Sequence, residues 1–280
     1  MLGDALDYAV HHPRRLANAL MRDPMELWDK LCDRLVQRWE YRHAVHYHHP
    51  SPDWEGELQT WLVAADASVE RAEFQALWPD VVHSACMMGI DVGPKSFAGF
   101  NDGDAALLRA IWLIMRRWKP TQVVETGVGH GFTSRFILEA MELNRRGQLS
   151  SIDRPPLDPQ MRTRVGIAVP HRLRHRWTML TGSSRRRLPG LLSNLGTIDL
   201  FVHDSLHTER NIRFELDRAW AVLRPGGFMI VDDVDSNAGL GSFSKTFPGS
   251  PTLVCEAEPV RPDERRFNKK GLFAIIAKPG

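Results

Sequence analysis

The stretch Val123-Val124-Glu125-Thr126-Gly127-Val128-Gly129-His130-Gly131 decides the fold of this chain. Its apolar start predicts a buried parallel strand, and the apolar spacing that follows from Phe132 to Met141 predicts a helix. A strand, a glycine turn and a helix in succession are typical of open α/β folds, which bind ligands at the carboxyl ends of their strands. Glycine suits such a turn because a side chain would block the approach or forbid the backbone angles.

The spacing of the glycines indicates the kind of ligand. The dinucleotide-binding fingerprint is Gly-x-Gly-x-x-Gly, whereas here an acid, Glu125, precedes glycines at alternate positions, Gly127, Gly129 and Gly131. This pattern resembles motif I of the class I S-adenosylmethionine-dependent methyltransferases. The resemblance implies that Glu125 and the three glycines border the methionine part of the cofactor. An ordinary glycine-rich turn is the alternative, since short motifs also occur by chance.

Size and composition limit the function classes. The 280 residues, 43% of them apolar, are enough for one α/β domain with an extension. The net charge of +2 does not by itself indicate a nucleic-acid partner. Cys32, Cys86 and Cys255 lack metal-ligand spacing and are typical of reduced core cysteines. No apolar run approaches the roughly 18–20 residues that cross a bilayer, and no signal-peptide pattern is present, so we expect a cytoplasmic protein without a membrane span.

Residues 1–95 differ from the rest and are predicted to form an N-terminal helical extension. A helix is expected to start at Pro24 after an Asp23 N-cap, and a second is expected from Trp54 to about Leu77, ending before Pro79. Such an extension would serve as a lid over the acceptor pocket or as an oligomer interface, so a homo-oligomer is possible. The cluster of Tyr41, His43, His46, Tyr47, His48 and His49 is either a metal site or, as we favour, a polar loop.

Residues 96–280 are predicted to form the class I methyltransferase domain, joined to the extension by a glycine-rich linker over residues 89–103. A helix is expected from Asp104 to Trp118, and a strand–helix alternation then runs to the end, as a parallel sheet requires. The fold class is therefore α/β, a Rossmann-like, mostly parallel sheet with helices on both faces. The resemblance implies seven strands with the last one antiparallel. After residues 122–124 the expected strands are 148–152, 177–180, 198–203, 228–231, 252–257 and 272–277.

Polar residues follow the carboxyl ends of successive predicted strands: Glu125, Asp153, Ser183, Asp204 and Asp232. These ends share one crevice in an open α/β sheet, so Asp153, Ser183 and Asp204 are predicted to bind the cofactor together with motif I. The Asp153 carboxylate could accept hydrogen bonds from ribose hydroxyls. The alternative for Asp153 is an Asp that starts a loop before Arg154-Pro155-Pro156.

Asp204, Asp232 and Asp233 are predicted to form a divalent-metal site, with Mg²⁺ as the expected ion, because Mg²⁺ takes carboxylate and water oxygens. Crowded carboxylates repel one another unless a cation neutralises them. His207, three residues after Asp204, is the predicted catalytic base for a substrate hydroxyl. A role for His207 in capping or orienting the following helix is the alternative.

These features resemble the metal-dependent O-methyltransferases, which include catechol O-methyltransferase and the sugar methyltransferases of macrolide and aminocoumarin pathways. The resemblance covers roughly residues 100–280 and implies metal ligands at Asp204 and Asp232-Asp233, with a base at His207. It also implies methylation of a hydroxyl on a small molecule or sugar. The sugar enzymes often have an acid where this chain has Leu206. Leucine cannot act as a base, so His207 is the favoured candidate for that role.

Two other functions remain open at this point: a hydroxylase-like enzyme on the same fold, and a non-catalytic scaffold protein. No two-His-one-carboxylate set supports the first, and the intact acidic positions argue against the second. Nucleic-acid methylation is disfavoured, because the chain lacks both a basic excess and the Asn/Asp-Pro-Pro-Tyr/Phe signature. Residues 185–187, three arginines, are either an anion site or the solvated face of a helix.

Overall fold

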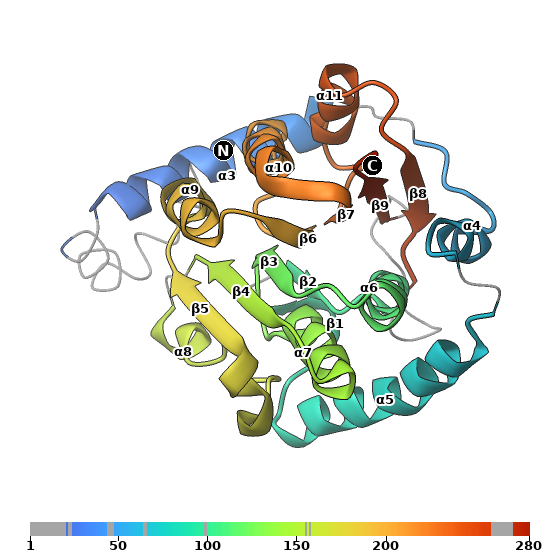
Figure 1. The fold of residues 1–280 in the computed structure, drawn as a ribbon. Coiled ribbons are helices and arrows are strands. Elements are labelled where there is room, and N and C mark those ends of the chain that lie inside the picture. Colours follow the sequence, from blue (N-terminus) through green and yellow to red (C-terminus); the bar gives the residue numbers. More distant parts are fainter. Residues whose placement is uncertain are drawn as a thin grey trace.

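The computed structural model describes residues 21, 24–43, 48–63, 66–97, 100–154, 156, 158–258 and 271–280. Its centre is a seven-stranded sheet in the order β5-β4-β3-β6-β7-β9-β8 (Figure 1). The strands from β3 to β7 are parallel, and β9 is antiparallel to both neighbours. The predicted sheet and its antiparallel last strand are thereby confirmed. The strands are β3 (Gln122–Thr126), β4 (Gln148–Asp153), β5 (Trp177–Thr181), β6 (Ile198–His203), β7 (Leu223–Val231), β8 (Thr252–Glu256) and β9 (Leu272–Ala277).

Helices cover both faces of the sheet and create two apolar cores (Figure 1). Strands buried on both faces need apolar residues at nearly every position, and all six residues of β6 are buried. One core joins the sheet to α5 (Ser68–Met87), α6 (Ala105–Trp118) and α7 (Phe132–Asn144). The other joins it to α9 (Ser184–Leu195), α10 (Glu209–Val222) and α11 (Gly239–Thr246). A short helix α8 (Pro159–Arg162) and a 3₁₀ helix (His171–Arg176) lie between β4 and β5.

The helix predicted from Asp104 to Trp118 is confirmed as α6, for which Asp104 is the N-cap. Its carboxylate accepts a hydrogen bond from the backbone N–H of Ala106 at 2.9 Å, which satisfies an otherwise unpaired donor of the first turn. The helix ends at Lys119, whose backbone adopts the left-handed conformation. This helix packs beside α7 and so supports the strand that carries motif I.

The N-terminal part differs from the prediction in two places. Instead of one helix ending before Pro79, there are two, α4 (Trp54–Trp61) and α5, and Pro79 lies inside α5. A proline removes one helical hydrogen bond, and the apolar face of α5 packed on the core outweighs that loss. The glycine-rich segment expected to be a linker contains a hairpin of β1 (Gly93–Phe97) and β2 (Phe100–Asp102). Strand propensity was hidden there by glycine and proline.

Helices α4 and α5 share the core of the sheet domain. Trp54 packs edge-on against Phe273 of β9 with ring centroids 5.7 Å apart, and Phe74 lies 5.3 Å from Phe136 of α7. Helices α4 and α5 thus pack directly on the domain predicted to begin at residue 96. No helix among the described residues is both long and apolar enough to cross a membrane.

Helix α3 (Pro24–His43) lies along the carboxyl-end edge of the sheet, past α9 and α10 (Figure 1). Asp33 pairs with Arg154, which follows β4, at 2.9 Å. Asp29 pairs with Arg186 of α9 at 3.3 Å, and the carboxylate of Glu40 accepts a hydrogen bond from the first backbone N–H of α10 at 2.8 Å. The segments that follow β4, β5 and β6 thus each make one polar contact with α3.

Candidate active site

Gly127 brings the end of β3 against the end of β6. Its φ is +86°, and a Cβ atom there would lie 1.8 Å from the backbone oxygen of Asp204. The backbone N–H of Asp204 donates to the oxygen of Thr126 at 2.8 Å. Because the obstacle is backbone, no side-chain rotation could make room for another residue. We call residues 127–131, between β3 and α7, the glycine loop. Glycine at position 127 therefore places Asp204 directly beside this loop.

Two carboxylates fix the glycine loop through three consecutive backbone N–H groups. Oδ2 of Asp153 accepts from Val128 at 3.2 Å and from Gly129 at 3.1 Å, and Oδ2 of Asp102 accepts from His130 at 2.9 Å. Burial raises the pKa of Asp153 to about 7, although the two N–H donors act to lower it. Asp153 thus lies at the predicted crevice, where it also organises motif I.

Asp102 was not singled out in the sequence. It belongs to β2 and also contacts Nδ1 of His130 at 2.8 Å. The His130 ring is fully buried between Phe97 and Phe132. A hairpin before the sheet therefore holds the glycine loop together with Asp153, and an acid near the end of the glycine-rich segment was the only signal for it.

Glu125 is fully buried and ties three elements together. Its Oε2 accepts hydrogen bonds from Ser134 of α7 and Ser151 of β4, both at 2.6 Å. Burial raises the pKa of Glu125 to about 8, against the lowering effect of the two hydroxyls. With no exposed surface, Glu125 in this structure supports the loop from behind.

Gly129, Gly131 and Ser183 complete the predicted cofactor set. The two glycines have φ values of +53° and +91°, which favour glycine. A Cβ at Gly131 would approach Gly166 to 3.0 Å. Ser183 precedes α9, and its buried Oγ has no hydrogen-bond partner among the described residues. A buried hydroxyl without a partner is costly, and a bound ligand could supply that partner.

The carboxyl ends of β6 and β7 bring the acidic residues and His207 together. Asp204, His207 and Asp232 offer ligand atoms that all lie within 4.8 Å of one another. Nε2 of His207 is 3.6 Å from Oδ1 of Asp204, and its Nδ1 is 2.8 Å from Oδ2 of Asp233. The three predicted metal ligands and the predicted base are thus neighbours. Asp233 points an oxygen at the imidazole, which the sequence could not show.

The electrostatics of this cluster favour bound positive charge. Burial, Asp233 and Asp204 raise the pKa of Asp232 well above its ordinary value. Burial acts to lower the pKa of His207, but Asp233, Asp204 and Asp232 together raise it well above the usual value. Carboxylates that lie this close together repel one another, and they favour a proton on Asp232 and on His207. A bound cation could take the place of that positive charge. Two carboxylates and an imidazole fit a divalent cation.

Next to this cluster lies a largely buried network centred on Glu215 of α10. Its Oε2 contacts Nδ1 of His203 at 2.6 Å and accepts from Thr126 at 2.5 Å. Its Oε1 accepts from Ser205 at 2.7 Å and from Asn211 at 2.9 Å. The network fixes the residues on either side of Asp204 and was not predicted.

Comparison with known proteins agrees with this geometry. A methyltransferase domain family matches residues 124–234, from the middle of β3 to just beyond the end of β7. Residues 124–234 are thus similar to a methyltransferase domain. No curated protein sequence matches the chain.

Solved structures resemble the methyltransferase domain at low sequence identity. A Klebsiella pneumoniae protein considered an O-methyltransferase is 16% identical with a TM-score of 0.53, covering 80% of this chain and 100% of that one. The O-methyltransferase TomG from Streptomyces achromogenes, solved with S-adenosylmethionine and involved in tomaymycin synthesis, is 16% identical with a TM-score of 0.50, covering 72% and 89%. An O-methyltransferase from Bacillus cereus, solved with S-adenosylhomocysteine, is 12% identical with a TM-score of 0.50, covering 79% and 100%.

These likenesses show the fold, and with the matched domain they confirm the predicted class I methyltransferase architecture. The family match includes Glu125, Asp153, Ser183, Asp204, His207, Asp232 and Asp233, together with the three glycines of motif I. The chemical role of each of these residues stays a prediction.

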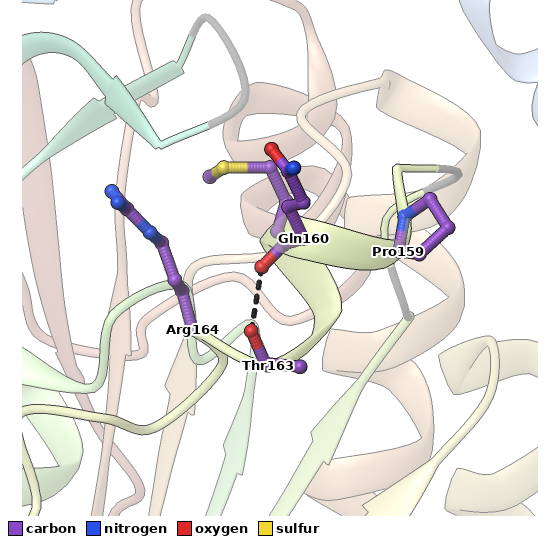
Figure 2. Close-up of a pocket in the computed structure, with 5 residues that line it drawn as sticks. Pro159, Gln160, Thr163 and Arg164 are labelled. Carbon is purple, nitrogen blue, oxygen red and sulfur yellow. Dashed lines mark hydrogen bonds between the residues drawn. The ribbon is translucent and has the colours of Figure 1, made fainter.

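A separate pocket lies at α8 of the methyltransferase domain, lined by Pro159, Gln160, Met161, Thr163 and Arg164 (Figure 2). The Thr163 hydroxyl donates to the backbone oxygen of Gln160 at 2.8 Å, as the dashed line in Figure 2 shows. None of the predicted site residues lines this pocket. We therefore assign it no role in the candidate site.

Two further sequence predictions concern the arginines 185–187 and the histidine and tyrosine cluster. In the run 185–187, Arg186 pairs with Asp29 and Arg187 donates to the backbone oxygen of Thr181 at 2.9 Å. Two of the three arginines thus serve local structure. The histidine and tyrosine cluster lies mostly outside the described residues, since only His48 and His49 have described side chains.

Proposed function

We propose that this chain transfers a methyl group from S-adenosylmethionine to a hydroxyl oxygen of a small molecule or sugar, with a divalent cation as helper. The observation that carries the proposal is the position of Asp204. This residue contacts the glycine loop through Gly127 and belongs to the cluster with His207 and Asp232. The methyl-donor site and the cation site would then be adjacent, with Asp204 at the border of both.

The residues at the crevice fit the cofactor. S-adenosylmethionine supplies a methyl group on a positively charged sulfonium, and the carboxyl groups of Asp153, Asp204 and Asp232 line this side of the crevice. The glycine loop removes side chains that would obstruct a ligand. The unpartnered hydroxyl of Ser183 offers a hydrogen bond at the end of β5.

The same cluster fits a cation that prefers oxygen ligands. Asp204 and Asp232 would hold Mg²⁺, with Asp233 beside them, since Mg²⁺ binds through one or two carboxylates and keeps several waters. When bound, the ion would make the acceptor hydroxyl more acidic. A softer metal would instead recruit the His207 nitrogen, so the nature of the ion decides the role of His207.

His207 is positioned to take the proton of the acceptor. Asp233 faces Nδ1 at 2.8 Å, which fixes the ring and leaves Nε2 directed at the cluster. Nε2 has no hydrogen-bond partner among the described residues. Without a cation the carboxylates favour the protonated ring. A bound cation would offset their charge, so that Nε2 could accept the hydroxyl proton as the oxygen attacks the methyl carbon. The sulfur keeps the electron pair of the broken bond, and the products are a methyl ether and S-adenosylhomocysteine.

The test is transfer of labelled methyl from S-adenosylmethionine to a panel of catechols, simple phenols and sugars, with Mg²⁺ or with EDTA. We expect label in a hydroxylated acceptor only with the ion present. His207→Gln should abolish transfer while Mg²⁺ binding persists, and Asp232→Asn should weaken Mg²⁺ binding. Undiminished transfer in EDTA would remove the cation from the proposal, and loss of Mg²⁺ binding in His207→Gln would make His207 a ligand.

The small net charge gives no support to a nucleic-acid acceptor. The three free cysteines fit a reducing compartment, and we retain the cytoplasm as a proposal.

A further inference from the structure

Helix α3, together with Met21 just before its first residue, presents a line of exposed, large apolar side chains. Soluble monomers rarely expose contiguous apolar patches of more than a few hundred Å². Elsewhere in the described chain, such residues are dispersed over other elements, among them Val63, Met87 and Leu143. The exposed fractions on this line are 76% for Met21, 67% for Met25, 65% for Trp28, 60% for Leu35 and 63% for Trp39.

The spacing of this line is that of a coiled-coil seam. From Met21 to Trp39, counting the partly buried Cys32 between Trp28 and Leu35, the steps are four, three, four, three and four residues. Steps of three and four in alternation place side chains along one side of a helix, where a second helix can pack them. We call Met21, Met25, Trp28, Cys32, Leu35 and Trp39 the α3 seam.

The domain holds α3 by a different side. Asp29, Asp33 and Glu40 make the contacts to α9, to Arg154 and to the start of α10. These acids lie on a polar side of the helix, so the α3 seam stays turned away from the sheet domain. The helix is thus anchored on one side and exposed on another.

The exposed area suits a second helix of the same kind. An aromatic side chain has roughly 150–250 Å² to bury. With its two tryptophans, two methionines and one leucine all more than half exposed, the seam exposes on the order of 600 Å² per copy. Two copies would bury on the order of 1,200 Å², the lower end of the range for specific interfaces. A two-fold symmetric dimer needs one self-complementary patch, and a single apolar seam provides it. The net charge of +2 leaves little repulsion between copies.

We propose that the α3 seam is the interface of a homodimer, in which α3 of one copy packs against α3 of a second copy. The contact between the two helices would also hold the α3 of each copy against the carboxyl-end edge of that copy's own sheet, next to Asp153. The inference rests on exposure and spacing, and is independent of the proposed methyl transfer.

Sedimentation velocity of the full chain over a range of concentrations tests the proposal. The wild type should sediment as a dimer, and Trp28→Glu combined with Leu35→Glu should sediment as a monomer at the same concentrations. Met87→Glu, which changes a residue 75% exposed on α5, is the matched control and should remain a dimer. A monomeric wild type at all concentrations, or a dimeric double variant, would overturn the proposal.

Cross-linking tests the same interface without disturbing it. A short bifunctional maleimide should join two copies through Cys32 in a Cys86→Ala background, which removes the exposed cysteine. Replacing Cys32 as well should abolish the joined species. If Cys32 gives no joined species while the wild type sediments as a dimer, a different surface forms the dimer and the proposal fails.

Discussion

Nδ1 of His207 lies 2.8 Å from Oδ2 of Asp233. Asp233 adopts a left-handed backbone conformation with φ of +51°, which is uncommon for a residue other than glycine and costs conformational energy. The carboxylate thereby reaches the imidazole from the adjacent strand end. This pair determines which nitrogen of His207 carries the proton and which one faces Asp204.

Asp233→Asn should lower both the pKa of His207 and the rate of methyl transfer. The carboxylate charge is the largest influence that raises the pKa of His207 against burial, and the neutral amide removes it. Loss of a carboxylate that orients a functional side chain typically costs about 10–100-fold in activity. NMR titration of the His207 ring protons measures the first effect and the pH–rate profile the second. An unchanged titration would show that Asp233 does not control His207.

Gly127→Ala should strongly destabilise the protein. The added methyl would lie 1.8 Å from the Asp204 oxygen and would require an unfavourable φ of +86°. We expect a loss of roughly 2–4 kcal/mol in the free energy of unfolding, from backbone strain and overpacking together. Chemical denaturation measures it. The matched control is Gly190→Ala, where no atom lies within 4 Å and alanine favours the helix. A Gly127 variant as stable as this control would contradict the close approach of the two strand ends.

Glu125→Gln should change how stability depends on pH. The pKa of Glu125 is about 8 in the folded protein, above the ordinary 4.5 that applies once the chain unfolds. The folded state therefore binds the extra proton, and this residue makes stability fall as pH rises from about 4.5 to 8. Its contribution reaches about 1.4 kcal/mol per pH unit.

The neutral amide cannot titrate, so the unfolding free energy of Glu125→Gln relative to the wild type should increase with pH over that window. Urea denaturation at several pH values, without cofactor, measures the difference. A constant difference would show that Glu125 is ionised in the folded protein.

Glu215→Gln should destabilise the protein and disturb the site in front of it. Burial acts to raise the pKa of Glu215, but the His203 imidazole and the hydrogen bonds hold it at about 2. Glu215→Gln removes a carboxylate that accepts several buried hydrogen bonds, and hydrogen bonds to charged groups typically contribute about 1.5–3 kcal/mol each. A double-mutant cycle with His203→Gln isolates the pair, and the two single losses should not add. Additive losses would mean that His203 and Glu215 do not act as a unit.

Local sequence signals predicted the parts of the site that lie at strand ends. Asp204 and Asp232 follow apolar runs, and the carboxyl ends of neighbouring parallel strands meet at one edge. The central strands β3 and β6 could be predicted because buried parallel strands are nearly continuous apolar runs. The bounds of the strands were predicted less well: β7 begins at Leu223, five residues before the strand expected at 228–231.

Contacts between distant segments left weaker signals or none. Glu215 lies on the apolar side of α10, near Ile212 and Leu216, and a carboxylate at such a position should have indicated a buried partner. Its partners Thr126 and His203 are 89 and 12 residues away, so only the sheet order brings them together. The contact of Asp102 with the glycine loop depends on a hairpin that no strand pattern in the sequence indicated.

The measurement that tests the account most directly is calorimetric titration of S-adenosylmethionine into the purified protein, with and without Mg²⁺. The account predicts one site per chain with micromolar affinity, and weaker binding by Asp153→Ala, which releases the glycine loop. Circular dichroism would confirm that both proteins are folded. Absence of binding by the folded wild type, with or without Mg²⁺, would contradict the methyltransferase function.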